Sequence, residues 1–246
     1  MMQRKKLKLL LASLAASTIL FAVPISVAAT DTPSSGNTSE DKEEAPSGSN
    51  VTDLSTLTKA LTLPKADDPC PKGCIHVFTG TSPHTVRVSS GDHTIYLRDD
   101  VRIDAKDDSP AFEVTGTAKV TLALETNCEA VFDGGKTAWA GLEVSEKAQL
   151  TIRGKGKLTA TGGEDGGAGI GGSSQSLNVG SITILDGDIT ATGKCGGAGI
   201  GSGVGGAAAN AINIKGGNVT ATGGDGQTRS ANDPVPPGPG IGSHLV

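Results

Sequence analysis

Alternation of apolar and polar residues recurs in short stretches along most of the chain after residue 75. A period of two is the pattern of a β-strand that buries one face, and glycine, aspartate, asparagine and serine between the stretches mark turns. The pattern predicts strands at residues 84–88, 94–97, 101–103, 111–114, 120–124, 142–144 and 150–152. Beyond its N-terminal region the chain is therefore expected to be all-β.

Two phrases of this pattern repeat near the C-terminus. The first places Thr-Ala-Thr-Gly after a large apolar residue and begins at residues 158, 189 and 219. The second reads Gly-Ala-Gly-Ile-Gly, with Pro for Ala in the last copy, and begins at residues 167, 197 and 238. A period of about 30 residues is typical of a solenoid, in which each repeat forms one coil and stacks on its neighbours.

Alternation within the repeats predicts which side chains face the core. Leu158, Ile189 and Val219 are expected to form one inner column, with the alanines two residues later beside it and the threonines outside. The isoleucines of the second phrase (Ile170, Ile200 and Ile241) should also point inward. Each coil then holds three short parallel strands, and the crossover rule for parallel strands makes it right-handed. The predicted fold is a right-handed parallel β-helix.

The N-terminal region carries two segments that are expected to stay outside the fold. Residues 1–29 combine four cationic residues, an apolar run and small residues at the end, which is the pattern of a secretory signal peptide. Residues 30–50 are rich in Ser, Thr, Gly, Pro and acidic residues, a composition typical of a disordered linker.

A third segment, residues 51–65, is expected to cover the first coil of a β-helix that spans residues 66–246. Leu54, Leu57 and Leu61 would share one face of a short helix, with Asp53 or Thr52 as its N-cap. Such a helix would cover the exposed edge that a first coil presents.

Charge limits the classes of partner. The chain has 21 Lys and Arg against 26 Asp and Glu, and removal of residues 1–29 takes away four cations and no acid, which leaves a net charge of −9. An acidic protein of this kind is not expected to bind nucleic acid or an anionic membrane surface. With no second apolar span, the protein is expected to be secreted or held at the cell surface.

Four cysteines are compatible with disulfides in an exported protein. Cys70 and Cys74 enclose a Pro-Lys-Gly turn that suits a local bridge, and a disulfide or unpaired thiols are the favoured interpretations. His76 raises the alternative of a small metal site, but the sequence shows no second ligand cluster at zinc spacing. Cys195 replaces a glycine of its repeat and is expected at a turn, and partners for Cys128 and Cys195 stay open.

Residues 84–242 resemble glycine-rich, β-helix-type exported repeat proteins of anaerobic and gut bacteria. The resemblance rests on phrases such as Ala148-Gln-Leu-Thr-Ile-Arg-Gly154 and Gly167-Ala-Gly-Ile-Gly-Gly172. Such proteins are described by analogy as carbohydrate-binding or adhesin-like, so the resemblance implies an exported β-helix and points to glycans as ligands. The resemblance assigns no functional residues to this chain.

Candidate site residues are of two kinds. Aromatic side chains can stack on sugar rings, and the only Trp and Tyr, Trp139 and Tyr96, are the candidates for carbohydrate binding, with Tyr96 expected to face solvent. A group of acids could hold Ca²⁺ or act in catalysis, although aspartate is also an ordinary turn residue. These acids are Asp99, Asp100, Asp104, Asp107 and Asp108.

The expected function is non-catalytic: an exported module that binds extracellular polysaccharide or a host or cell-surface glycan, in the manner of an adhesin. No resident cofactor is expected, apart from Ca²⁺ as a candidate. The alternative is a polysaccharide-active lyase or hydrolase, which would need these acids gathered in one groove. A purely structural surface protein remains open, and the stacked threonines leave open an ice-binding protein.

Overall fold

The computed structural model of this protein describes residues 43–64, 73–106, 108–174, 176, 178–207, 209–230 and 233–243. The expected signal peptide, most of the expected linker and Cys70 lie outside the described residues. No helix in the described part of the chain is long and apolar enough to cross a membrane.

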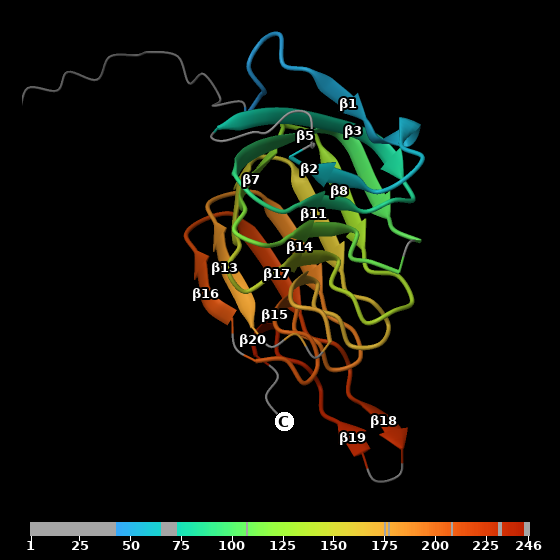
Figure 1. The fold of residues 1–246 in the computed structure, drawn as a ribbon. Coiled ribbons are helices and arrows are strands. Elements are labelled where there is room, and N and C mark those ends of the chain that lie inside the picture. The colour runs from blue at the N-terminus through green and yellow to red at the C-terminus, as the bar shows by residue number, and fades with distance from the viewer. Residues whose placement is uncertain are drawn as a thin grey trace, which may run out of the picture. The chain divides into compact units, whose positions relative to one another are not determined.

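The described residues form a parallel β-solenoid with three faces (Figure 1). The first face contains β16 (Ala209–Ile214), β13 (Val179–Ile184), β10 (Gln149–Gly154), β7 (Lys119–Leu124) and the first part of β5 (Asp92–Asp104). The second face contains the last part of β5, β8 (Glu129–Asp133), β11 (Lys157–Thr161), β14 (Asp188–Thr192) and β17 (Asn218–Thr222). At the N-terminal end, β3 (Cys74–Ser82) pairs with β5, and β1 (Val51–Asp53) pairs with β3.

The third face is a separate seven-stranded sheet. In order, it contains β2 (Leu61–Leu63), β4 (Val86–Val88), β6 (Phe112–Val114), β9 (Leu142–Val144), β12 (Ile170–Gly171), β15 (Ile200–Gly201) and β20 (Ile241–Gly242). All pairings on the three faces are parallel, whereas β18 (Gln227–Ser230) and β19 (Asp233–Val235) form an antiparallel hairpin within the proline-rich insertion. The prediction of an all-β parallel solenoid with three strands per coil is confirmed.

Strand β5 turns the corner between the first two faces. Its residues 92–97 pair with β7, and its residues 100–104 pair with β8. The turn lies at Asp99, whose φ of 55° is in the left-handed region that aspartate tolerates better than most residues. The two strands expected at 94–97 and 101–103 are therefore one bent strand.

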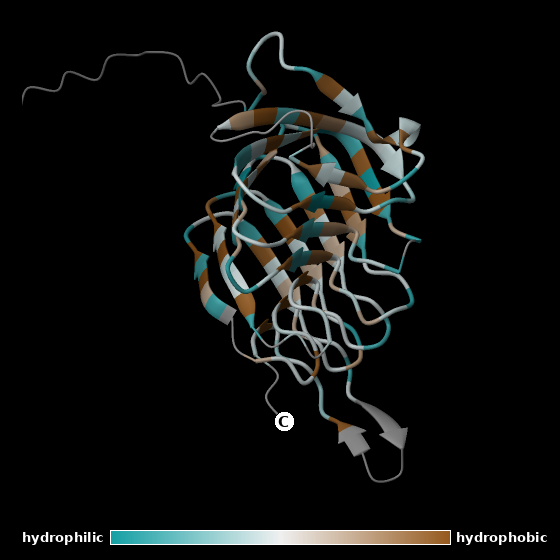
Figure 2. Ribbon diagram, viewed as in Figure 1, coloured by the Kyte–Doolittle hydropathy of each residue, from teal (hydrophilic) through white to brown (hydrophobic). Residues whose placement is uncertain are grey.

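The core consists of columns of like side chains, as the alternation predicts. Leu158, Ile189 and Val219 lie in register on the second face, and the alanines two residues later form the neighbouring column. Figure 2 shows apolar and polar residues alternating along these strands. Ile170 and Ile200 are fully buried, but Ile241 is 48% exposed because β20 is the last strand of its sheet.

The prediction of a helix at residues 51–63 is wrong. The segment forms strand β1, a single 3-10 turn at Leu54–Thr56 and strand β2. Asp53 does cap the turn, accepting a hydrogen bond from Ser55 N at 2.9 Å. Pairing with β3 and β4 satisfies more backbone groups than an isolated short helix would, and the turn still buries Leu54 completely.

The expectation of a disordered linker as far as residue 50 needs correction for its last residues. Glu43 forms an ion pair with Arg153 of β10, and Ala45 N donates to Glu125 Oε1 at 2.9 Å. Ala45 also packs on a small apolar cluster outside the first face, formed by Val77, Tyr96 and Ala123. We call residues 43–45 the strap, since they cross the outer surface of this face.

Candidate functional site

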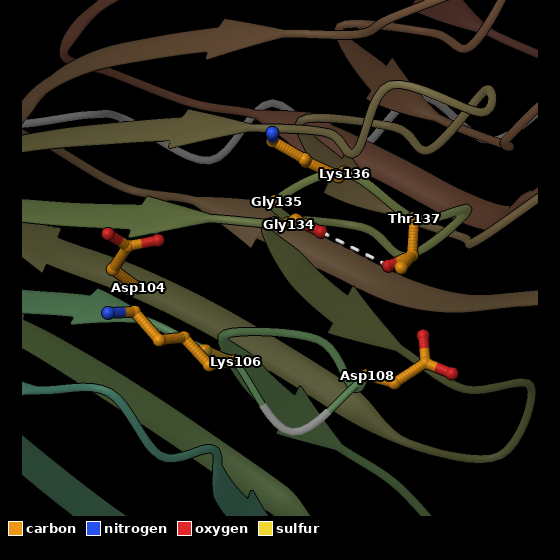
Figure 3. A pocket seen from close by; sticks show the side chains of 8 residues that line it. Asp104, Lys106, Asp108, Gly134, Gly135, Lys136 and Thr137 are labelled. Atoms are coloured by element: carbon orange, nitrogen blue, oxygen red, sulfur yellow. Dashed lines mark hydrogen bonds between the residues drawn. The ribbon is translucent and has the colours of Figure 1, made fainter.

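A depression of about 310 Å³ lies beside the second face, where the chain leaves β5 and β8 for the third face. Two consecutive coils supply its walls, because the ends of β5 and β8 are in register and the turns that follow them stack. Its lining residues are Asp104, Ala105, Lys106, Asp108, Gly134, Gly135, Lys136 and Thr137. Figure 3 shows Asp104 and Lys106 on one side of it and Asp108 and Thr137 on the other.

Local geometry holds the turn after β8 in place. Asp133 accepts a hydrogen bond from Gly135 N at 2.9 Å, and Gly135 has a φ of 71°, which favours glycine. Thr137 Oγ1 donates to the Gly134 carbonyl at 3.4 Å. The side chains of Lys136 and Thr137 are thereby presented at the edge of the depression, together with two carboxylates from the neighbouring coil.

Trp139 is joined to this depression by a hydrogen bond. Its indole Nε1 donates to Asp108 Oδ1 at 3.0 Å, so the ring of one coil is held by the carboxylate of the coil before it. The Trp139 carbonyl accepts from Gly163 N at 2.8 Å, which fixes its backbone to the coil after it. Trp139 is partly exposed and adjoins the depression through Asp108, while the depression itself is lined by both carboxylates and ammonium groups.

A row of polar side chains leads away from the depression along the second face. Asp104 and Asp133 are in register, and the next three positions of the same row are Thr161, Thr192 and Thr222. Parallel strands lie about 4.8 Å apart, so the row offers oxygen ligands at a regular spacing along the solenoid axis. The second set of outward threonines (Thr159, Thr190 and Thr220) runs beside it.

Of the acids singled out in the sequence, Asp104 and Asp108 line the depression, whereas Asp99 and Asp100 do not. Asp99 and Asp100 are exposed at the corner of β5, Asp104 lies 4.0 Å from Arg102, and Asp108 holds Trp139. Asp107 lies outside the described residues. Within the described residues, no three His, Cys, Asp or Glu side chains come close enough together to hold a metal ion.

The expectation that Tyr96 faces solvent is wrong. Tyr96 does point away from the core, as alternation requires, but it is only 8% exposed because the strap covers it. The guanidinium of Arg153 lies 5.6 Å from its ring centroid, and Arg153 also donates to the Tyr96 hydroxyl at 3.3 Å. Tyr96 therefore offers no open surface to a sugar ring.

Three of the four cysteines lie within the described residues. Cys74 is disulfide-bonded, and Cys70, its expected partner, lies outside them. Cys128 and Cys195 are free and buried, and Cys195 occupies a turn at a φ of 46°, as its replacement of a repeat glycine predicts. Burial, helped by the charge of Glu125, raises the pKa of the Cys128 thiol to about 12, which makes it a poor nucleophile.

One group of titratable residues is brought together by the fold without any signal in the sequence. Arg87, Glu113 and Glu143 occupy successive rungs of the third face and point outward. Arg87 forms an ion pair with Glu113, and Ser173 donates to Glu143. Burial, together with the charge of Glu113, raises the pKa of Glu143 to about 7. Each of these residues is the central residue of a different short strand. The sequence therefore gives no sign that the fold brings them together.

Comparison with protein families identifies the repeats. The model of the beta helix repeat matches the chain at residues 150–174, 182–204 and 212–243, which are the coils built on β10, β13 and β16. Comparison with curated proteins and with solved structures gives no match. The chain is a parallel β-solenoid that contains beta helix repeats.

Proposed function

We propose that this protein is an exported glycan-binding module. The observation that supports the proposal best is the depression of about 310 Å³ with Trp139 at its side, held by the Asp108 carboxylate. Sugar sites combine an aromatic face, which packs on the C–H groups of a pyranose ring, with a few polar groups that orient the hydroxyls.

The polar groups around this depression suit hydroxyl ligands. Carboxylates of Asp104 and Asp108 accept hydrogen bonds, while the ammonium groups of Lys106 and Lys136 donate them. Since Asp108 already holds the indole N–H through one oxygen, its other oxygen is left to accept from a ligand. Both signs of charge occur together, which fits a neutral or mixed-charge sugar better than a highly charged one.

The threonine row supports a linear polymer as the ligand. It begins at the depression with Asp104 and continues over Asp133 to Thr161, Thr192 and Thr222. A saccharide chain bound at Trp139 could lie along this row and gain hydrogen bonds at successive coils. Secretion, inferred from residues 1–29, would bring the protein to such polysaccharides.

A glycan array tests the proposal with the full chain, in the presence and absence of Ca²⁺. Selective binding by the wild type is expected, with an affinity loss of about tenfold or more for Trp139→Ala, because an aromatic stacking contact and its buried area are lost. Asp108→Asn should weaken binding less, since the amide can still accept from the indole. Ca²⁺ acts at this site only if its removal also weakens binding.

Tyr96→Phe is the matched control, since its ring lies under the strap and should leave binding unchanged. A blank array, or binding that Trp139→Ala leaves intact, would show that this depression is not the sugar site. Binding that is lost equally in the control would point to damage of the fold.

Glu143 supports a second candidate, a polysaccharide hydrolase or lyase. A carboxyl group with its pKa raised to about 7 beside a second glutamate resembles the pairing of a general acid with a second carboxylate. This function predicts new reducing ends or unsaturated products from a susceptible polysaccharide, and their loss in Glu143→Gln. Binding without any such product favours the non-catalytic module.

A further inference from the structure

Two histidines lie at the N-terminal ends of two neighbouring inward-facing columns, His93 in register with Val120 and His76 in register with Ile95. On the first face His93 occupies the inner position that holds Val120, Leu150 and Ile182 in the following coils. His93 is only 2% exposed, so its burial needs polar partners. His76, two residues after Cys74 on the neighbouring strand β3, provides one of them.

The hydrogen-bond partner of His93 Nε2 assigns the proton on that nitrogen. His93 Nε2 lies 2.7 Å from the Ser90 carbonyl oxygen, which can only accept, so Nε2 carries the proton. The lone pair on His93 Nδ1 then faces His76 Nε2 at 3.1 Å. The two rings lie side by side, with centroids 5.3 Å apart and planes inclined by 24°.

We propose that His76 Nε2 and His93 Nδ1 form a binding site for a divalent transition-metal ion such as Zn²⁺ or Cu²⁺. Two ligands on a tetrahedral ion with metal–nitrogen bonds of about 2.0–2.1 Å lie about 3.3 Å apart, close to the separation observed here. Each ring must tilt by roughly 35° from its direction in the hydrogen bond to turn its lone pair toward a common tetrahedral ion. Binding requires the other tautomer of His76, in which the proton has moved from Nε2 to Nδ1 and the ring stays neutral.

The surroundings of His93 match those of a metal ligand. A histidine that binds a metal through one ring nitrogen usually donates its other N–H to a carbonyl or carboxylate, which fixes the tautomer and the ring plane. Ser90 serves this role for His93. His76 is partly exposed, so an ion can reach the pair from its side.

The site takes two protein ligands, and water completes the coordination. Cys74 stands directly opposite His93 in the ladder, but its sulfur is held in a disulfide and supplies no thiolate. Imidazole suits Zn²⁺, Ni²⁺ and Cu²⁺, and the general order of affinities places Cu²⁺ above Zn²⁺. Apart from the aspartates considered for Ca²⁺, the sequence indicates a metal site only at Cys70, Cys74 and His76. The fold adds His93, which lies 17 residues farther along the chain from His76.

Isothermal titration calorimetry of the full, untagged chain with ZnCl₂ and with CuSO₄, after treatment with a chelator, tests the site. The wild type should bind about one ion per chain, with Cu²⁺ tighter than Zn²⁺, and His93→Gln and His76→Gln should each weaken binding roughly tenfold or more. His84→Gln is the matched control, since it removes an imidazole from the same region and should bind as the wild type does.

His76→Gln keeps the proposal testable even if the buried substitution at His93 damages the fold, which circular dichroism would reveal. Absence of saturable binding by the wild type would overturn the proposal and leave the pair as a hydrogen-bonded core contact. Binding that His76→Gln does not weaken, or that His84→Gln weakens equally, would also overturn it.

Discussion

Replacement of Glu143 by glutamine should stabilise the protein at alkaline pH and leave its stability at acid pH nearly unchanged. Glu143 lies in the third face with its carboxyl group largely removed from water, beside Glu113 and bonded by Ser173. Burial disfavours the charged form, and the Glu113 charge adds to this effect, whereas Ser173 and Arg87 oppose it. The net result is a folded pKa of about 7 against 4.5 for an unperturbed glutamate.

The magnitude follows from this difference in pKa. The folded protein binds more protons than the unfolded chain between pH 4.5 and about 7. Stability associated with the protonated group is therefore complete below pH 4.5 and is lost as pH rises through the folded pKa. At about 1.4 kcal/mol for each pKa unit, the loss is on the order of 3 kcal/mol by pH 8. Glutamine stays neutral, accepts from Ser173 and escapes this loss.

Urea unfolding at several pH values from about 5 to about 8 measures the effect. The free energy of unfolding of Glu143→Gln, relative to wild type, should rise by about 2–3 kcal/mol over this range. Glu129→Gln is the control, since Glu129 is 62% exposed and pairs with Lys157 at the surface. Parallel pH profiles for wild type and Glu143→Gln would refute the argument that burial keeps this carboxyl group protonated.

Three further predictions concern the core, the corners and the cysteines. Phe132→Ala should lower the free energy of unfolding by about 3–5 kcal/mol, because a fully buried ring stacked on Phe112 is lost; a cost under about 1 kcal/mol in urea unfolding would contradict this packing. Gly171→Ala should lower the melting temperature strongly, since Gly171 has a φ of 136° and the added Cβ would lie 1.9 Å from the Gly201 carbonyl oxygen; an unchanged value would show that the corner can relax. Cys128 should resist iodoacetamide in the folded chain and react after denaturation, as mass spectrometry of the peptide can show; rapid labelling of the native protein would contradict its burial and raised pKa.

The repeated coils can be predicted because equivalent residues recur along the sequence at a nearly constant spacing. Leu158, Ile189 and Val219 follow one another at nearly equal intervals, and parallel stacking then places them in one column. The same periodicity fails toward the N-terminus, where coils differ in length and composition. The leucines of residues 54–61 fit a helical face as well as a turn between two strands. The strand conformation is favoured only because β3 and β4 offer edges with which the segment can pair.

The site residues were predictable one at a time but not in their combinations. Trp139 was a candidate for its chemistry, but its contact with Asp108 needs two turns of neighbouring coils to stack. Glu143 and His93 look like ordinary strand residues, and their environments come from strands one coil away. The expectation that Tyr96 faces solvent is wrong because alternation indicates only the side of the strand on which a residue lies, and the strap covers that side.

The strap has a mechanical consequence. Its few residues touch four adjacent strands, through Val77 of β3, Tyr96 of β5, Ala123 of β7 and Arg153 of β10. A pulling force on the N-terminal tail would first load these lateral contacts together, in shear across the face. Without them, the same force would peel β1 from β3 one hydrogen bond at a time. Loss of the Glu43–Arg153 ion pair should therefore lower the rupture force by a larger fraction than it lowers the free energy of unfolding.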